Sequence, residues 1–313
     1  MELSLFLYSF LIPTLFGAGL LALGWFLPPL RRRKTLQVAM FGIALGAGLL
    51  GSFYAESGLP VFPPPRSDAW IGWLGPLMVV VALAASLLVN NARVLRLELF
   101  GILLGAFVAC LPLFAWMASS ASAPKSLFPG MSGADHAMLG FMIAFAAIVM
   151  ARLQEARQGT LLPCLLALVF TTGSLTALAA GWITMGILFG VVAAISGSGA
   201  LIGRFSGASG IGIGGAMAAV LLLVILPVAT WCKTSPPDDL HWWFWLMIPG
   251  SLLLLVPCEN RWFERLPALV AFWVRVVFVA LPLVYVLVKV VPMLAGGSSD
   301  GTDEFEDMMK LYE

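Results

Sequence analysis

The stretch TLLPCLLALVFTTGSLTALAAGWITMGILFGVVAAISGSGALIGR, residues 160–204, decides the fold, because no charged residue lies in it before the final Arg204. At 1.5 Å per residue, a single helix of this length would measure roughly 66 Å, about twice the thickness of the hydrocarbon core of a bilayer. The stretch therefore predicts two membrane-crossing helices, 161–179 and 181–203, with a turn near residues 180–182.

The composition of the whole chain agrees with a membrane location. Of its 313 residues, 61% are hydrophobic and only 11% are charged, whereas about a quarter of the residues of a soluble domain are charged. Such a chain has too few polar groups to cover a surface in water, so the lipid bilayer is its expected partner. The formal net charge of +1 provides no basic field, and no nucleic-acid partner is expected.

Apolar stretches of about 20 residues recur along the chain, and each is long enough to cross the hydrocarbon core. They predict an all-α, polytopic integral membrane protein of about ten transmembrane helices. The predicted helices are 4–27, 36–55, 70–90, 98–118, 136–152, 161–179, 181–203, 210–231, 242–258 and 267–294.

The cations predict the orientation. The loops after the odd-numbered predicted helices carry Arg31, Arg32, Arg33, Lys34, Arg93, Arg96, Arg152, Arg157, Arg204, Arg261 and Arg265. The loops after the even-numbered helices carry only Arg66, Lys125 and Lys233. Since cytoplasmic loops are enriched in Lys and Arg, both termini are predicted to lie outside the cell. The expected location is the cell membrane, as a multi-pass protein of the bacterial inner membrane.

Residues 1–295 are predicted to form a single transmembrane domain. Five helices in 1–152 and five in 161–295 would give the two parts opposite orientations, as in inverted-repeat transporters. The tail 296–313 has a high density of Asp and Glu, which predicts a flexible segment or a docking segment for a basic partner.

A substrate path is predicted where hydroxyl groups and glycines gather within the helices. Its residues are Thr171, Thr172, Ser174, Thr176, Ser196, Gly197, Ser198 and Gly199, joined by Arg275 in the last helix. The hydroxyls would line the path, and the glycine-rich stretch would be a broken helix at mid-membrane. Two structural alternatives stay open: hydroxyls can bond to their own backbone, and glycines spaced by four residues let helices pack closely.

Arg275 has its own alternative interpretation. It lies about two turns inside the last predicted helix, and a charge within a span is a functional hypothesis by default. A long side chain can also extend toward the interface, where Glu259 or Glu264 would pair with it.

The two histidines, His136 and His241, are predicted at the outer ends of two helices, next to Asp135 and Asp239. If these ends meet, the four side chains are a candidate site for a divalent metal. In the alternative interpretation, the two aspartates are anions at helix N-termini. The sequence specifies no cofactor.

Three functions are compatible with these features. The favoured one is a permease that moves a small or lipid-like solute. The alternative is a non-catalytic membrane subunit or assembly protein that docks membrane-protein partners through the outer loops 56–68 and 119–135 and the acidic tail. A lipid-modifying enzyme is disfavoured. It would use Asp135, His136, Asp238, Asp239 and His241.

Overall fold

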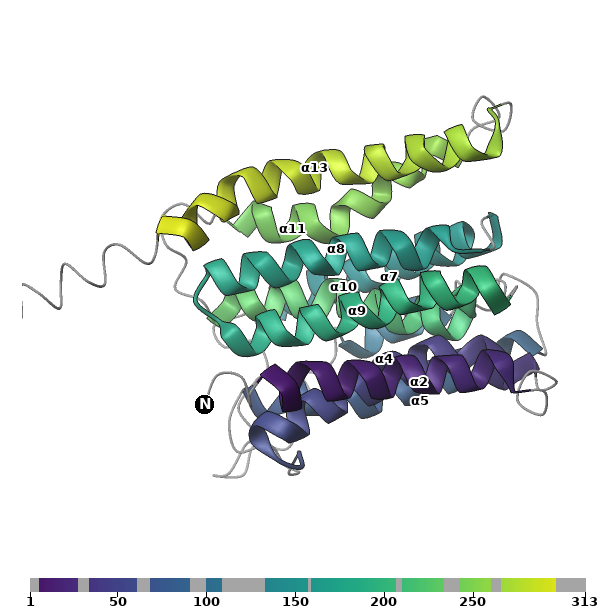
Figure 1. The fold of residues 1–313 in the computed structure, drawn as a ribbon, viewed down its shortest axis with the longest axis horizontal. Coiled ribbons are helices and arrows are strands. Elements are labelled where there is room, and N and C mark those ends of the chain that lie inside the picture. Colours follow the sequence, from purple (N-terminus) through teal and green to yellow (C-terminus); the bar gives the residue numbers. More distant parts are fainter. Residues whose placement is uncertain are drawn as a thin grey trace, which may run out of the picture.

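The computed structural model describes residues 6–27, 34–60, 68–90, 100–108, 133–156, 159–206, 210–233, 242–259 and 266–296, and this part consists of helices joined by short turns. Its elements are η1 (Leu7–Leu11), α2 (Ile12–Phe26), α4 (Lys34–Ser57), η2 (Asp68–Trp73), α5 (Leu74–Asn90), α7 (Gly133–Ala156), α8 (Leu161–Ala179), α9 (Ile183–Ser206), α10 (Gly212–Lys233), α11 (Trp242–Gly250), η3 (Ser251–Leu255), η4 (Pro257–Glu259) and α13 (Ala268–Gly296). In this part, eight helices are long and apolar enough to cross a membrane, which supports a multi-pass membrane protein. The helices lie alongside one another in a bundle (Figure 1).

The uncharged stretch forms two helices, as predicted. α8 ends at Ala179 and α9 begins at Ile183. Gly181 has a φ of +79°, its N–H donates to the carbonyl of Leu178, and the N–H of Trp182 donates to the carbonyl of Ala177. This is the Schellman arrangement. It requires one residue in the left-handed backbone conformation, which glycine adopts without strain.

Two of the ten predicted spans, 98–118 and 242–258, are not among the eight long apolar helices. For 98–118, the structure describes only residues 100–108, which are helical. For 242–258, α11 ends at Gly250 and the chain continues as the 3-10 turns η3 and η4. Pro249 lies in the last turn of α11 and has no N–H to donate to the carbonyl of Trp245, so the regular helix ends there. The predicted number of ten spans stays a prediction.

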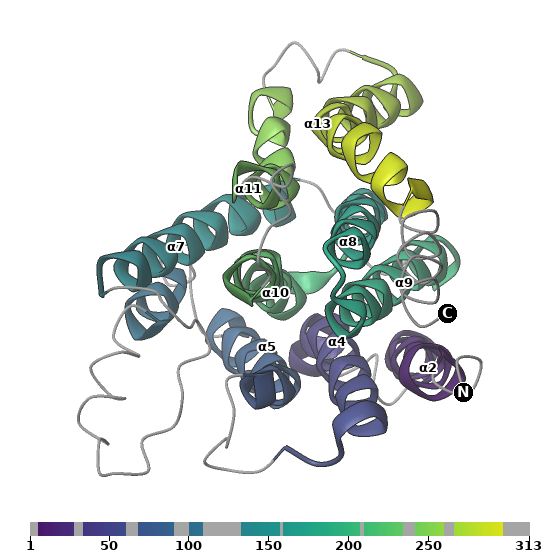
Figure 2. The same cartoon turned by 90° about the vertical axis from the view of Figure 1, so that its left-hand side faces the viewer.

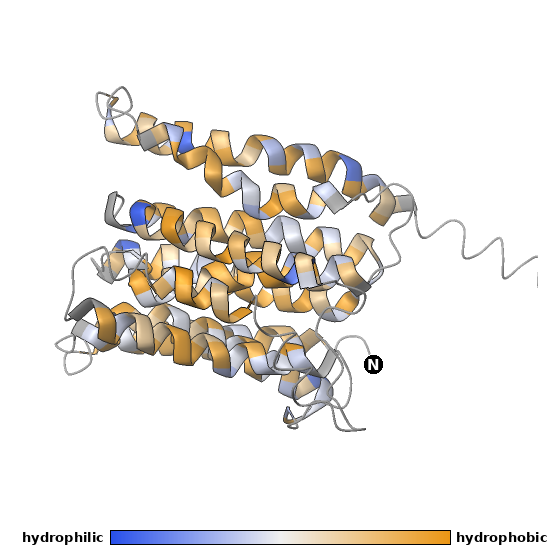
Figure 3. Cartoon of the chain, turned by 180° about the vertical axis from the view of Figure 1, so that it is seen from behind, coloured by the Kyte–Doolittle hydropathy of each residue, from blue (hydrophilic) through white to orange (hydrophobic). Residues whose placement is uncertain are grey.

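The bundle is built around α10. It lies at the centre when the bundle is viewed along its axis (Figure 2), and 94% of its most apolar 18 residues are buried, against 22% for α13. Large apolar side chains are also exposed around the bundle, for example Phe141 (71%) and Leu201 (63%). Figure 3 shows apolar residues along the sides and most of the hydrophilic ones near the two ends. This distribution suits a hydrocarbon surrounding.

The first and last described helical segments finish at the same end of the bundle. In Figure 1, the start of η1 and the end of α13 lie on the left, where the α8–α9 turn also lies. The opposite end holds the end of α2 and the start of α13. This arrangement agrees with the prediction that both termini lie on the same side of the membrane.

Glycines allow three central helices to approach closely. A Cβ added at Gly46 of α4 would lie 2.6 Å from the carbonyl oxygen of Gly75 in α5, and one added at Gly75 would lie 2.7 Å from that of Gly46. Gly42, one turn earlier, faces the methyl groups of Ala82 and Ala218 in the same way. In lipid, where dispersion holds helices together, such close contact is a main source of stability.

The π-helical turn η1 is joined to α4 by a hydrogen bond that compensates for a proline. In an α-helix, the N–H of residue 13 would donate to the carbonyl of Ser9, but Pro13 has none. The hydroxyl of Ser52 donates to that carbonyl instead, with 2.5 Å between the oxygens, and both serines are buried. Side-chain hydroxyls commonly bond backbone groups that proline frees in membrane helices.

We expect Ser52→Ala to lower the free energy of unfolding by about 1–3 kcal/mol, because the buried carbonyl of Ser9 loses this donor. In a Pro13→Ala background the same substitution should cost less, because residue 13 then has an N–H for that carbonyl. Thermal unfolding of the four variants in detergent measures both costs. Equal losses in the two backgrounds would contradict this role of the bond.

Candidate functional site

The sequence predicted that threonine hydroxyls line a substrate path. In the structure, these hydroxyls donate hydrogen bonds to backbone carbonyls of their own helix, α8. Thr171 donates to the carbonyl of Ala167 (2.7 Å), Thr172 to that of Leu168 (3.1 Å), and Thr176 to that of Thr172 (2.8 Å). Thr172 and Thr176 are buried and Thr171 is exposed. The hydroxyls therefore reach hydrogen-bond partners without a solute.

Ser174 differs from these threonines because its hydroxyl leaves its own helix. It donates to the carbonyl of Gly186 in α9, 2.7 Å away. A Cβ added at Gly190, one turn further along α9, would lie 3.4 Å from the Ser174 hydroxyl. The Ser174 hydroxyl thus links α8 to α9 by a hydrogen bond near the turn that connects the two helices.

The glycine- and serine-rich stretch lies within a continuous helix. α9 runs without a break from Ile183 to Ser206. Ser198 donates to the carbonyl of Ala194 (2.8 Å), and the space beside Gly199 is occupied by the Phe41 ring. Ser196 is fully buried, and its hydroxyl has no hydrogen-bond partner among the described residues. Gly197 lies next to Ala167 of α8.

Arg275 is 4% exposed, so its side chain lies inside the protein. Its Nη2 donates to the backbone carbonyl of Cys258, 3.2 Å away. This bond connects α13 to η4, where the carbonyl belongs to a 3-10 turn. An anchoring role for Arg275 is consistent with this contact.

The four residues of the predicted metal site are only partly described. Asp135 lies in the first turn of α7, and His136 beside it is buried. Asp239 and His241 lie outside the described residues, as does Asp238 of the enzyme hypothesis. Within the described part, no group of three or more His, Cys, Asp or Glu side chains is suited to hold a metal.

The subunit hypothesis also rests mainly on residues that the structure does not describe. Of the loops 56–68 and 119–135, residues 61–67 and 119–132 lie outside it, and so does the tail from 297 onward. Docking of partners through these segments stays a prediction.

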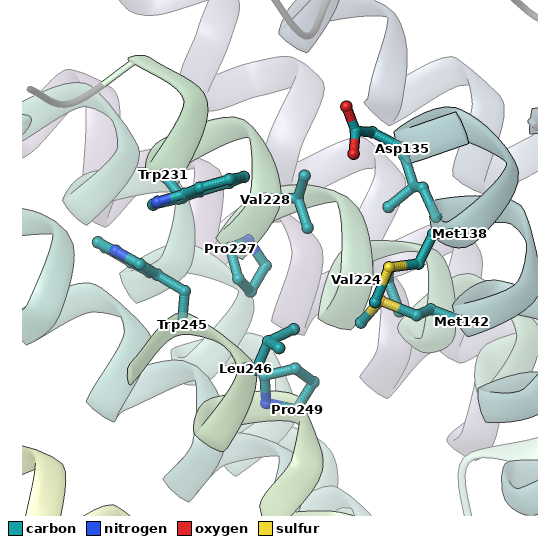
Figure 4. A pocket seen from close by; sticks show the side chains of 11 residues that line it. Asp135, Met138, Met142, Val224, Pro227, Val228, Trp231, Trp245, Leu246 and Pro249 are labelled. Atoms are coloured by element: carbon teal, nitrogen blue, oxygen red, sulfur yellow. The ribbon is translucent and has the colours of Figure 1, made fainter. Parts of the chain in front are cut away.

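An apolar groove that the sequence analysis did not predict lies between α7, α10 and α11. Its volume is about 340 Å³, within the range of roughly 300–1,000 Å³ for small-molecule pockets. Figure 4 shows the side chains that surround it. They are Asp135, Met138, Leu139 and Met142 of α7, Val224, Pro227, Val228 and Trp231 of α10, and Trp245, Leu246 and Pro249 of α11.

The local sequence of each helix shapes this groove. On α7, Met138 and Met142 are one turn apart and face the same side. Methionine side chains adapt easily to ligands of different shape. Pro227 of α10 and Pro249 of α11 face the groove from the other two helices. Ten of the eleven lining residues are apolar or aromatic, so the groove suits a hydrocarbon-rich ligand.

The groove has one charged lining residue. Asp135 supplies a carboxylate. Trp245 is 2% exposed, and its indole N–H has no hydrogen-bond acceptor among the described residues. The indole nitrogen itself is buried, so the side of the Trp245 ring that lines the groove is apolar.

Outside the groove, a hydrogen bond between two side chains joins α4 to α9. The hydroxyl of Thr184 donates to Oε1 of Glu56, a residue that the sequence analysis placed in a loop. Glu56 instead lies in the last turn of α4. Ser52, which bonds to Ser9, is one turn earlier on that helix, so hydrogen bonds from neighbouring turns of α4 hold both η1 and α9.

We expect Thr172→Val and Thr176→Val to change the free energy of unfolding by no more than about 1 kcal/mol each, because each removes one hydrogen bond while nearly preserving shape. Movement of a solute or lipid across proteoliposome membranes should stay within about twofold of the unsubstituted protein. A tenfold loss of movement with unchanged stability would show instead that these hydroxyls contact the solute.

No family model matches the chain, and neither a curated protein nor a solved structure matches it. What the protein does must therefore be inferred from the chemistry of its own residues.

Proposed function

We propose that the protein is a permease that moves a lipid-like solute, and that the groove between α7, α10 and α11 receives this solute. The observation that carries the proposal is the nearly complete apolar lining of a cavity of about 340 Å³. Hydrocarbon chains gain from dispersion contacts with such a lining, whereas a hydrophilic solute would lose its hydration there.

The hydroxyl cluster supports a lipid-like rather than a hydrophilic solute. A path for a sugar or an ion would need polar groups that turn toward it. The hydroxyls of Thr171, Thr172 and Thr176 bond to backbone carbonyls of α8, and that of Ser174 bonds to α9. The groove, by contrast, has the volume and the lining for an acyl or prenyl chain.

Filling the groove tests this proposal. Val228→Trp places an indole among the lining residues, and we expect it to slow lipid movement about tenfold, which corresponds to an activation free energy higher by roughly 1.4 kcal/mol. The probe is a short-chain fluorescent phospholipid in proteoliposomes, whose transfer between leaflets is followed with an impermeant quencher. Val288→Trp is the matched control, because Val288 is 63% exposed on the outer side of α13.

The control should move the probe at the rate of the unsubstituted protein. The proposal is wrong if the unsubstituted protein moves the probe no faster than protein-free liposomes. It is also wrong if Val228→Trp, folded and inserted, is as fast as Val288→Trp.

For the membrane arrangement, we propose ten spans with both termini outside, in the cell membrane of a bacterium. Arg204 in the last turn of α9 and Arg152 near the end of α7 are two of the cations that the positive-inside rule places in the cytoplasm. The described helices supply eight spans. Trp243–Leu255 and the helix containing 100–108 would supply the other two.

Cysteine labelling tests this orientation. In a background without the native cysteines, Leu59→Cys should react with an impermeant thiol reagent added to intact spheroplasts. Phe205→Cys should react only after lysis. Both parent side chains are highly exposed, at 72% and 75%. Leu59 follows the end of α4 and Phe205 lies in the last turn of α9, and these two helices end on opposite sides of the bundle. The reverse pattern of labelling would overturn the proposed orientation.

A further inference from the structure

The last long helix, α13, is the least enclosed part of the described bundle. Only 22% of its most apolar 18 residues are buried, the lowest share among the eight long apolar helices of the described part. Figure 1 shows α13 along one side of the bundle, next to α11. The face that contacts the protein contains the buried Arg275 and Val279. The opposite face is therefore available for contact with lipid or with another protein.

A stripe of aliphatic residues runs along the centre of this outer face. Its members, here called the valine stripe, are spaced alternately four and three residues apart: Val270, Val274, Val277, Leu281, Val284, Val288 and Val291. Six of the seven are between 46% and 63% exposed. The stripe extends roughly 30 Å along α13, which matches the thickness of the hydrocarbon core.

Bulky side chains lie beside the valine stripe and not within it. With about 3.6 residues per turn, Leu269 and Trp273 fall along one edge of the stripe, and Phe278 and Tyr285 fall along the other. An open hollow of about 420 Å³ is lined by Trp273, Phe278, Leu269 and valines of the stripe. The valines form its floor between two aromatic walls. A hole of this shape receives a side chain from a facing helix.

The regular spacing favours a protein neighbour over lipid. A lipid-facing helix needs apolar residues of no particular spacing or size, and rings such as Phe16 (57% exposed) of α2 and Phe141 (71%) of α7 project from other helices. A repeat of about 3.5 residues is instead the pattern with which one helix packs along another over several turns. Valine suits such packing, because its stiff side chain has little conformational freedom to lose.

We propose that two copies of this chain form a parallel dimer through the valine stripes of their α13 helices. The positive-inside rule inserts every copy in the same direction, so a two-fold axis along the membrane normal places each stripe residue beside its counterpart. A second copy therefore carries a stripe of the same spacing at the same depth. In lipid, where dispersion holds helices together, this fit stabilises the pair.

This inference goes beyond the proposed function and does not depend on it. The groove is lined by α7, α10 and α11 of one chain. Each copy therefore keeps its own groove, whether or not it is paired.

Disulfide formation tests the pairing. In a background without the native cysteines, Val270→Cys and Val277→Cys place thiols on the stripe, whereas Leu269→Cys and Phe278→Cys place them beside it at nearly the same depths. Leu269 is also more exposed than Val270, at 70% against 46%. Membrane vesicles are treated with copper phenanthroline, and the dimer band is measured on a non-reducing gel. We expect roughly fivefold more dimer from each stripe cysteine than from its neighbour, because residues of the repeat lie closest across the helix pair.

A bulky residue on the stripe should separate the copies. Val288→Trp should lower the dimer yield of Val277→Cys about fivefold, because its indole prevents the close approach of the two helices. Leu269→Trp, at the edge of the stripe, is the matched control and should leave the yield unchanged. Transfer of the fluorescent phospholipid by Val288→Trp should stay at the rate of the unsubstituted protein, since the groove lies elsewhere.

The outcomes separate the dimer from the proposed function. Equal yields from the stripe cysteines and their neighbours would indicate random collision and overturn the dimer. The absence of disulfides at all four positions, or a product without twice the mass of the chain, would overturn it as well. A failure of the unsubstituted protein to move phospholipid would remove the proposed function and leave the dimer in place.

Discussion

The structure depends on one constraint: in hydrocarbon, each backbone N–H and C=O must find its partner within the protein. The described chain meets it with helices and, where a helix is interrupted, with side-chain hydrogen-bond donors. Ser52 bonds the carbonyl of Ser9, which Pro13 cannot reach, and Arg275 bonds the carbonyl of Cys258 in a 3-10 turn. The buried indole N–H of Trp245 is an exception, because it has no acceptor among the described residues.

Close packing at the centre and looser packing at one side follow from the distribution of small residues. Gly46 and Gly75 bring the backbones of α4 and α5 into contact, and Gly42 does the same toward Ala218 of α10. The facing positions of α7, α10 and α11 carry methionine, valine, proline and tryptophan instead, and there a cavity of about 340 Å³ remains. Rigid packing beside an adaptable groove is an arrangement that allows a ligand to enter without disturbing the core.

Much of the fold could be predicted, because hydrophobic runs report helix length directly. The predicted helix 161–179 has the bounds of α8, and the predicted turn contains Gly181. The prediction was least complete where proline changes a helix, as Pro249 does in α11. Glu56 was assigned to a loop because a charge usually marks the end of a span, yet it forms part of the last turn of α4 and bonds to Thr184.

By itself, the sequence determined the membrane-helical class, the separation of α8 from α9 and the positions of the polar residues along each helix. These follow from local properties: hydropathy, helix length and the conformational freedom of glycine. Only the tertiary structure decided which partner each hydroxyl has, and that residues 135–142, 224–231 and 245–249 surround one groove. Hydrophobic periodicity says which residues avoid water, but in a bilayer lipid and protein are equally apolar neighbours. The sequence pattern therefore does not distinguish a side chain that faces lipid from one that faces a ligand.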